Sequence, residues 1–193
     1  KDIRTSRETA SFLPPNVTDQ DIWDFDGSGL ITATSASSPT HDVQAMVLPN
    51  TDTKYLDDIA TIDKAMGPDR LFLLVNPFWR NLNSWGFNIL APKAKNKAKS
   101  VLFDNKNGGY EETYVLLRFS VRGESCIAIK SYPYDWQLFA TLEDEDNSNY
   151  GYTRYIRLGS CKEEPKTELV TKLLNEREEF KMTKTMRQLK KRL

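Results

Sequence analysis

The sequence predicts an α/β fold, and three patterns along the chain support that prediction. Residues 71–75 form a continuous apolar run, which is typical of a strand covered on both faces, as in a parallel sheet. A strand pattern at 43–48 and a helix pattern at 52–66 precede this run, so strand, helix and strand alternate. Residues 114–139 then alternate apolar and polar side chains with a period close to two, which predicts two buried strands joined by a tight turn.

The amino-terminal segment, residues 1–43, is expected to be an irregular cover over the core. It contains two successive prolines, a pair of nearby glycines and a small-polar tract at 32–40, all of which favour loops. Large apolar side chains would hold this segment against the core. They are Phe12, Leu13, Ile22, Trp23 and Phe25.

Two helices are predicted in the first half of the chain. Thr51 or Asp52 can cap the first, which Gly67 would end. Its apolar positions recur at a spacing near 3.6 and are Tyr55, Leu56, Ile59, Ile62 and Met66. Residues 93–103 are expected to form a second, crossover helix.

The second half of the chain is expected to contain a hairpin and further strands. The hairpin is expected to turn at Arg122, Gly123 and Glu124. Residues 136–142 fit a short helix or strand, and 152–158 fit an edge strand. We expect four side chains here to be largely buried: Leu117, Ile129, Tyr132 and Trp136.

The chain ends in a basic segment, residues 175–193. Thr167 is placed to cap a final helix, and an apolar stripe continues from that helix to the last residue. The segment has no acidic residue after Glu179, and its cations are Lys181, Lys184, Arg187, Lys190, Lys191 and Arg192. Such a helix can lie on an anionic membrane surface, follow phosphates or dock into a partner. A solvated terminal extension is the alternative.

Composition limits the classes of protein to consider. The 193 residues are 39% hydrophobic, which is enough for one domain with a core. The 27 basic and 27 acidic residues give no net charge, so attraction to nucleic acid or membranes must come from local patches. One patch is the carboxyl-terminal segment. The other consists of Lys93, Lys95, Lys97, Lys99 and Lys106.

The cysteines and the hydropathy pattern bear on compartment. Cys126 and Cys161 form neither a zinc knuckle nor a CxxC pair, which favours a reducing compartment. No apolar run approaches the roughly twenty residues of a spanning helix, and no signal-peptide core is present. We therefore expect a soluble chain. Because it begins with Lys1, an upstream segment such as a transit peptide is expected to have been removed or to lie outside this sequence.

Residues 24–35 imitate a calcium-binding EF-hand loop. Oxygen ligands fall at positions one, three and five, and a glycine falls at position six. These residues are Asp24, Asp26, Ser28 and Gly29. Position twelve is Ser35, where a bidentate glutamate is needed, and no amphipathic helix precedes the loop. We predict a turn and no calcium site.

The sequence predicts no catalytic, cofactor or metal site. The glycines at 27–29 and 107–109 lack the spacing of phosphate-binding loops. His41 is the only histidine, so a classical serine or cysteine triad would require it as the base, and a surface histidine is the plainer interpretation. Adjacent carboxylates such as Asp57 and Asp58 point in different directions on a helix.

Large aromatic side chains crowd the segment after residue 75. Phe78, Trp79 and Trp85 supply apolar area at a loop, where such area often serves recognition. We predict that these three residues and the basic tail bind a partner. The alternative is that the tryptophans simply cap the sheet.

Four segments of the chain carry a family resemblance. They are LVNPFW at 74–79, ETYVLLR at 112–118, KSYPYDWQLF at 130–139 and EP at 164–165. In order and type they resemble a plastid and cyanobacterial domain-of-unknown-function family that includes the Low PSII Accumulation assembly factors. A related domain forms the carboxyl-terminal extension of a plastid adenylate kinase. The similarity runs from about residue 44 to residue 174, and the tyrosine-proline-x-x-tryptophan motif is its best signature.

The resemblance implies a fold and a setting. It implies one Rossmann-like, three-layer α/β domain with a mixed sheet over 44–174, between the irregular segment 1–43 and the extension 175–193. It also implies a chloroplast protein without an established catalytic set, in the stroma or peripheral to the thylakoid membrane. Some members of the family assist photosystem II biogenesis.

Our first hypothesis is therefore a noncatalytic assembly or scaffolding factor that acts through protein-protein contacts. Its partner would be a protein complex such as a photosystem assembly intermediate, and its basic tail could also meet an anionic membrane surface or nucleic acid. Two alternatives stay open. One is a nucleotide-binding, enzyme-like protein, because Rossmann-like sheets often place ligands at strand ends. The other is a nucleic-acid-associated subunit of a plastid complex, because of the two basic patches.

Overall fold

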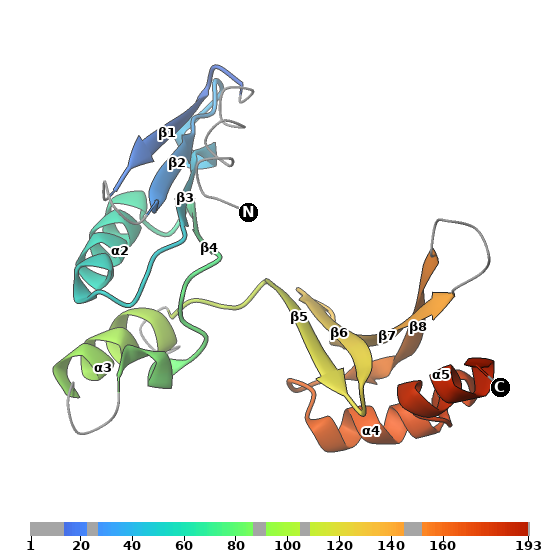
Figure 1. Ribbon diagram of the computed structural model, residues 1–193. Helices are drawn as coiled ribbons and strands as arrows, with labels where there is room; N and C mark the ends of the chain where they lie inside the picture. Colours follow the sequence, from blue (N-terminus) through green and yellow to red (C-terminus); the bar gives the residue numbers. More distant parts are fainter. Residues whose placement is uncertain (1–13, 23–26, 87–91, 105–108, 145–151, 193) are drawn as a thin grey trace. The chain divides into compact units, whose positions relative to one another are not determined.

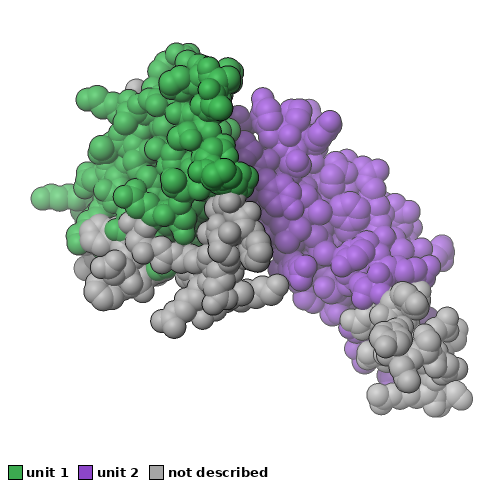
Figure 2. All heavy atoms as spheres, turned by 90° about the horizontal axis from the view of Figure 1, so that it is seen from above, with its two compact units in different colours: residues 1–110 green, residues 111–193 purple. Residues whose placement is uncertain are grey.

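The computed structural model describes residues 14–22, 27–86, 92–104, 109–144 and 152–192. The chain divides into two compact units, Lys1–Tyr110 and Glu111–Leu193 (Figure 2). Each unit contains its own four-stranded sheet and its own cluster of buried apolar residues.

Unit 1 is built on a mixed sheet with strand order β1-β2-β3-β4 (Figure 1). Its strands are β1 (Val17–Asp21), β2 (Gly29–Ala33), β3 (Val43–Val47) and β4 (Leu71–Val75). The first three strands pair antiparallel, and β4 pairs parallel with β3. The parallel pair requires a crossover, which α2 (Thr53–Met66) supplies.

Both ends of α2 follow from its sequence. Asp52 is the amino-terminal cap, and its carboxylate accepts a hydrogen bond of 3.0 Å from the backbone N–H of Lys54. Gly67 ends the helix with φ of 70°, a left-handed conformation that glycine adopts without strain. Tyr55 is fully buried, and its hydroxyl is hydrogen-bonded to that of Ser28, which joins the start of β2 to the helix.

Shorter helices complete unit 1. They are the 3₁₀ helices η1 (Pro39–His41) and η2 (Leu82–Trp85), and α3 (Pro92–Ala98), which runs into a π-helical turn, η3 (Lys99–Phe103). The core joins buried side chains of the sheet, α2, η2, α3 and η3. Its members include Met46, Tyr55, Leu56, Ile59, Met66, Phe72, Trp85, Ala98 and Leu102.

Unit 2 is an antiparallel sheet covered by helices on one side (Figure 1). Its strands are β5 (Tyr114–Val121), β6 (Glu124–Ser131), β7 (Trp136–Asp144) and β8 (Tyr152–Cys161), paired in sequence order. The covering elements are α4 (Thr167–Asn175), the 3₁₀ turn η5 (Glu178–Phe180) and α5 (Lys184–Arg192).

The β5–β6 hairpin closes through a two-residue turn. Val121 pairs with Glu124, and Arg122 and Gly123 between them have φ of 55° and 79°. Positive φ at both positions is the backbone twist that two-residue hairpins prefer. The predicted turn is confirmed at Arg122 and Gly123, whereas Glu124 is already the first residue of β6.

The core of unit 2 lies between the sheet and α4. Leu138 and Leu158 from the sheet pack with Val170 and Leu174 from α4, and Phe180 joins them with no exposed surface. Burial of each such side chain stabilises the fold by about 1.5–3 kcal/mol. The cluster draws all its members from unit 2, as the other core does from unit 1.

The architecture differs from the single three-layer domain that the resemblance implies. The α/β class is confirmed, but the structure has two separate four-stranded sheets, and one Rossmann-like domain over 44–174 is not confirmed. The division after Tyr110 falls inside that range. The segment 1–43 was expected to be irregular, yet it supplies β1 and β2, because its polar residues pair as strands at the antiparallel end of the sheet.

The predicted core residues meet different outcomes. Trp136 is buried, with 3% of its surface exposed, and the segment that it begins is a strand. Leu117 and Ile129 are half-buried. Tyr132 is 58% exposed, so its predicted burial is wrong: it lies beyond the end of β6, in the turn that leads to β7.

The carboxyl-terminal helix also differs from the prediction. The periodic apolar stripe predicts one continuous helix, but α4 ends at Asn175 and a 3₁₀ turn separates it from α5. Thr167 begins α4 but does not cap it: the cap position is Lys166, which makes no capping side-chain hydrogen bond. Among the described residues, no helix is long and apolar enough to cross a membrane.

Candidate functional site

The side of the second sheet that faces away from α4 is the most distinctive surface of the described residues. Because side chains alternate along a strand, Val115, Leu117 and Phe119 face the core while their neighbours face the other way. We call this second side the open face. Its aromatic and aliphatic side chains are Tyr114, Leu116, Ile127, Ile129, Phe139 and Tyr155.

Strand register places four of its side chains in one row across the sheet. Arg118 of β5 pairs with Ile127 of β6, Ile127 pairs with Phe139 of β7, and Phe139 pairs with Arg157 of β8. The row therefore has a cation on each edge strand and two apolar side chains on the central strands. We call it the Arg118–Arg157 row.

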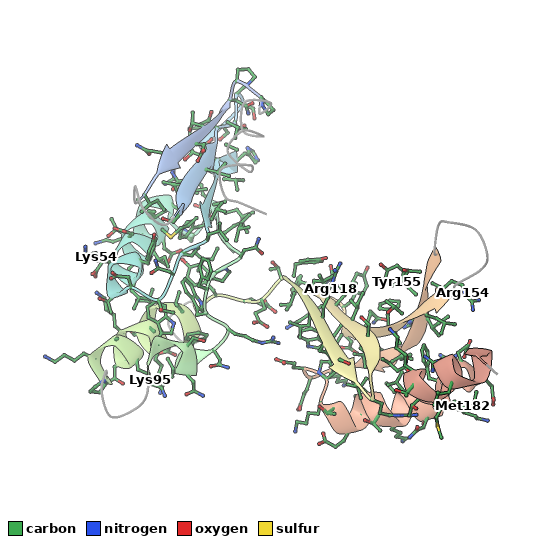
Figure 3. The ribbon with its side chains drawn as sticks, in the orientation of Figure 1. Lys54, Lys95, Arg118, Arg154, Tyr155 and Met182 are labelled. Atoms are coloured by element: carbon green, nitrogen blue, oxygen red, sulfur yellow. The ribbon has the colours of Figure 1, made fainter. Side chains whose placement is uncertain are left out.

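Parts of the open face are strongly exposed. Tyr114, Leu116 and Tyr155 expose 64%, 44% and 61% of their surfaces, whereas Ile127 is buried and Phe139 half-buried. Figure 3 shows Arg118 and Tyr155 on the side of the sheet away from the helices. Large exposed aromatic side chains on a strand that also buries a core face are typical of recognition surfaces.

Arg118 and Arg157 bring positive charge to the open face. Arg157 donates a hydrogen bond of 2.6 Å from Nη2 to Oε1 of Gln137 on the same face. No described side chain of the open face is acidic; its remaining members carry hydroxyl groups. The face can therefore offer apolar contact between two positive charges.

The aromatic loop predicted to bind a partner is mostly part of the unit 1 core. Trp85 exposes 3% of its surface, and its ring lies 5.2 Å from that of half-buried Trp79. For Trp85 the structure therefore favours the alternative interpretation, in which the tryptophans pack on the fold and do not bind a partner. Phe78 remains as the exposed aromatic residue of the three, at 63%.

The basic tail is partly anchored to unit 2. Arg187 donates a hydrogen bond of 2.6 Å from Nη2 to Oε2 of Glu124, whose side chain is 2% exposed. Arg187 also donates to the backbone carbonyl of Met182 at 2.6 Å and lies 5.4 Å from the Phe180 ring centre. Lys181 pairs with Glu178. The predicted partner-binding cations therefore include one, Arg187, that holds the helix in place.

The other cations of the predicted tail site are less informative. Lys184 begins α5. The side chains of Lys190, Lys191 and Arg192 lie outside the described residues, although their backbone continues the helix. In the second basic patch, Lys97 pairs with Asp57 of α2 and Lys95 donates to Asn83 at 3.0 Å, so two of its charges support the packing of unit 1.

The carboxyl ends of the parallel strands are where an α/β sheet would hold a nucleotide. Here the backbone N–H of Leu48 bonds to the carbonyl of Val75, and that of Phe78 bonds to Pro49, so the two loops pair with each other. The carboxylate of Asp52 occupies the amino terminus of α2. A negative charge at this position opposes phosphate binding.

The described part of the chain contains no cluster of potential metal ligands. No group of three or more potential ligands gathers there. Of the calcium-like loop, Asp24 and Asp26 lie outside the described residues, while Gly29–Ala33 forms β2. Burial raises the pKa of the Cys126 thiol to about 11, with a smaller contribution from the nearby Glu124 charge. A thiol with a raised pKa is a poor nucleophile.

Comparison with known families assigns the chain. A family model described as a domain of unknown function, DUF1995, matches residues 5–172. The chain belongs to the DUF1995 family. No curated protein and no solved structure matches it. The DUF1995 match includes β1 through β8 and most of α4, so the open face belongs to the family domain, whereas α5 lies beyond the matched range.

No sequence motif marks the open face of the DUF1995 domain. Arg118 interrupts the apolar strand pattern of 114–121, and alternation alone places it opposite Leu117 and Phe119. In the strand 152–161, alternation likewise places Tyr155 and Arg157 on the same side of the strand. The periodicity is therefore sufficient to predict which side of its strand each residue takes. It does not predict the strand register that aligns Arg118 with Arg157.

Proposed function

We propose that this protein is a noncatalytic assembly or scaffolding factor that acts through protein-protein contacts. The observation that carries the proposal is the open face of unit 2. It combines exposed Tyr114, Leu116 and Tyr155 with Arg118 and Arg157 and has no acidic member among its described side chains. Interface cores are enriched in aromatic residues and arginine and depleted in lysine, aspartate and glutamate.

A protein partner fits the open face better than nucleic acid does. Single-stranded nucleic acid is held by a groove of positive charge together with stacked rings, and its affinity depends on the number of phosphates neutralised. The open face has two cations, and its middle is occupied by the aliphatic Ile127 and Ile129. The whole chain has no net charge. Apolar contact therefore dominates this surface.

A nucleotide-binding, enzyme-like role receives less support. The strand ends of unit 1 carry the Asp52 carboxylate at the start of α2, where a phosphate would otherwise meet free backbone N–H groups. We therefore favour the scaffolding role.

The cellular setting is part of the proposal. The motifs at 74–79, 112–118 and 130–139 resemble those of the plastid and cyanobacterial family that includes the Low PSII Accumulation factors. By that similarity the protein acts in the chloroplast, in the stroma or at the thylakoid periphery, on photosystem assembly intermediates. Lys190, Lys191 and Arg192 could add attraction to an anionic membrane surface.

Affinity purification of the tagged full chain from stroma and thylakoid fractions tests the proposal. We expect mass spectrometry to identify photosystem II subunits. The double variant Leu116→Ser/Tyr155→Ala should recover less of them, because it removes apolar area from the open face. Leu71→Ser is the matched control, since Leu71 is similarly exposed, at 54%, but lies in unit 1. If the wild-type chain recovers no photosystem subunit above a mock purification, the proposal is wrong.

A further inference from the structure

We infer that the open face receives an acidic amphipathic helix from a partner protein, with its apolar stripe over Phe139, Ile129 and Leu116 and its acidic borders at Arg118 and Arg157. This inference deepens the proposed function and rests on it, because it takes the partner to be a protein.

The dimensions of the Arg118–Arg157 row fit a helix. The row crosses four adjacent strands, so its two ends are separated by three strand spacings, or roughly 14 Å. An α-helix with its side chains is about 10–12 Å wide. A helix lying on the central strands would therefore cover the two apolar members of the row and reach an arginine on each side.

The layer structure of unit 2 favours a helix over other elements. The opposite side of the same sheet is covered by α4, whose Val170 and Leu174 are fully buried against it. A sheet with apolar residues on both faces forms a stable domain when a further layer covers the second face. Two residues along the strands from Arg118 and Ile127, the next row of the open face pairs Leu116 with Ile129. These two side chains lengthen the apolar strip along the strands.

Charge defines the chemistry of the partner helix. The two arginines stand at opposite edges of the apolar strip, and the described side chains between and around them include no acid. Glutamate or aspartate at the borders of a docked helix would pair with both, whereas lysine there would be repelled. Arginine also stacks on apolar and aromatic surface, which suits it to the edge of such a contact.

The acidic and basic helices of the described residues, α2 and α5, do not fit this position. α5 is basic, with Lys184, Arg187 and three further cations, and would bring like charge against the two arginines. α2 carries acidic residues, but its apolar side, including Leu56 and Ile59, is buried in the unit 1 core. A second copy of the chain offers the same helices. The occupant is therefore a helix of another protein.

Two synthetic peptides test the inference on the full chain. Both are about 15–20 residues long, the length at which isolated helices begin to be stable, with a leucine stripe on one side. One has glutamate along both borders of the stripe, and the other has lysine at the same positions. Binding is measured by fluorescence anisotropy, and methyl NMR of labelled isoleucine and leucine locates the contact. We expect the glutamate-bordered peptide to bind and to shift the methyl signals of Leu116, Ile127 and Ile129.

Charge reversal supplies the decisive variant. In Arg118→Glu/Arg157→Glu the glutamate-bordered peptide should bind at least about ten-fold more weakly, because two attractive pairs become repulsive. The lysine-bordered peptide should then bind this variant better than it binds the wild-type chain. Lys172→Glu/Arg177→Glu is the matched control, with the same change in charge at exposed positions in and just after α4. If the double reversal unfolds the protein, Arg118→Gln/Arg157→Gln should still weaken binding of the glutamate-bordered peptide.

The inference is overturned if the glutamate-bordered peptide does not bind, if both peptides bind equally, or if the methyl shifts are confined to the α4 side, such as Leu173. Tighter binding of a single-stranded uridine oligonucleotide at the same methyl groups would also overturn it in favour of nucleic acid. The helix-docking inference and the proposed scaffolding function can fail independently. If wild type and Arg118→Glu/Arg157→Glu recover photosystem subunits equally from plastid fractions, the scaffolding role stands and the open face is not its helix-binding surface.

Discussion

Arg187 of α5 donates a 2.6 Å hydrogen bond to the buried carboxylate of Glu124, 63 residues earlier in the chain. Glu124 follows the β5–β6 turn directly, so this pair joins the basic tail to the hairpin. Arg122 of the same turn donates to the Phe180 carbonyl at 3.2 Å and to the side chain of Asn175 at the end of α4. The tail of the protein is therefore a structural part of unit 2 at least as far as Arg187.

Arg187→Ala is expected to destabilise unit 2 by about 3–5 kcal/mol, because it leaves a buried carboxylate without its cation. Urea unfolding followed by tryptophan fluorescence measures the change. Lys181→Ala is the control: it removes a charge from an exposed pair with Glu178, which should contribute no more than about 1 kcal/mol. Equal effects of the two substitutions would show that the Glu124–Arg187 pair does not stabilise the fold.

Truncation after Glu179 is expected to destabilise unit 2, although the composition of the tail alone predicts a removable extension. The truncation deletes Phe180, which has no exposed surface, as well as Arg187. Loss of a buried phenylalanine side chain alone costs about 3–5 kcal/mol. Deletion of residues 190–193 is the control and should leave the midpoint of unfolding nearly unchanged. A cooperative, wild-type transition after the longer truncation would contradict this expectation.

Trp136→Ala is expected to cost about 3–5 kcal/mol, because the side chain is buried in the unit 2 core and its removal leaves a large cavity. Tyr134→Ala, two residues earlier and 70% exposed, should change stability by less than about 0.5 kcal/mol. Thermal and chemical unfolding of the two variants decides between these outcomes. A near-neutral Trp136→Ala would mean that the core is not packed as described.

Alkylation should distinguish the two cysteines. Cys126 is buried with a pKa raised to about 11, so it should react much more slowly with iodoacetamide at pH 8 than half-buried Cys161. Burial also raises the pKa of Cys161, followed by the charges of Asp135 and Glu163. Mass spectrometry of a time course on folded protein gives both rates, and unfolding in urea should make them similar. Faster modification of Cys126 in the folded protein would contradict its placement.

The raised pKa of Cys126 also predicts a pH dependence of stability. Because the fold favours the neutral thiol, the contribution is fully present below the ordinary pKa of 9.0 and is lost as pH rises toward about 11. Cys126→Ala should remove this decline from the difference between unfolding free energies at pH 8.5 and pH 10.5. An unchanged difference would assign the alkaline loss to other groups.

A fragment of residues 111–193 is expected to fold without the rest of the chain. All the buried members of its core, from Val121 to Phe180, lie within it. We expect a single cooperative urea transition and dispersed amide signals in NMR. A Trp136→Ala version of the fragment should lose both features, which provides the control. A fragment that stays unfolded while the full chain folds would show that unit 2 depends on residues 1–110.

Local chemistry predicted much of the secondary structure. A cap at Thr51 or Asp52, the end of α2 at Gly67, the hairpin turn at Arg122 and Gly123 and the burial of Trp136 all follow from the preferences of nearby residues. These features depend on contacts within a few residues or on strong hydrophobicity, so one sequence is enough to predict them. The α/β class follows for the same reason.

Tertiary pairing decided the rest. Segment 1–43 contains two strands that are stable only because β2 pairs with β3 and β1 pairs with β2. Trp85 was predicted to be exposed from its loop position, but the unit 1 core covers it. In the sequence, Arg187 is not distinguishable from the other cations of the tail. Only the fold places it beside Glu124, which is 63 residues away in the chain. The alignment of Arg118 with Arg157 likewise depends on three successive strand registers, including an irregularity in β7–β8 pairing. Periodicity shows which side of a strand a residue takes, whereas its neighbours across the sheet depend on long-range pairing that no local pattern encodes.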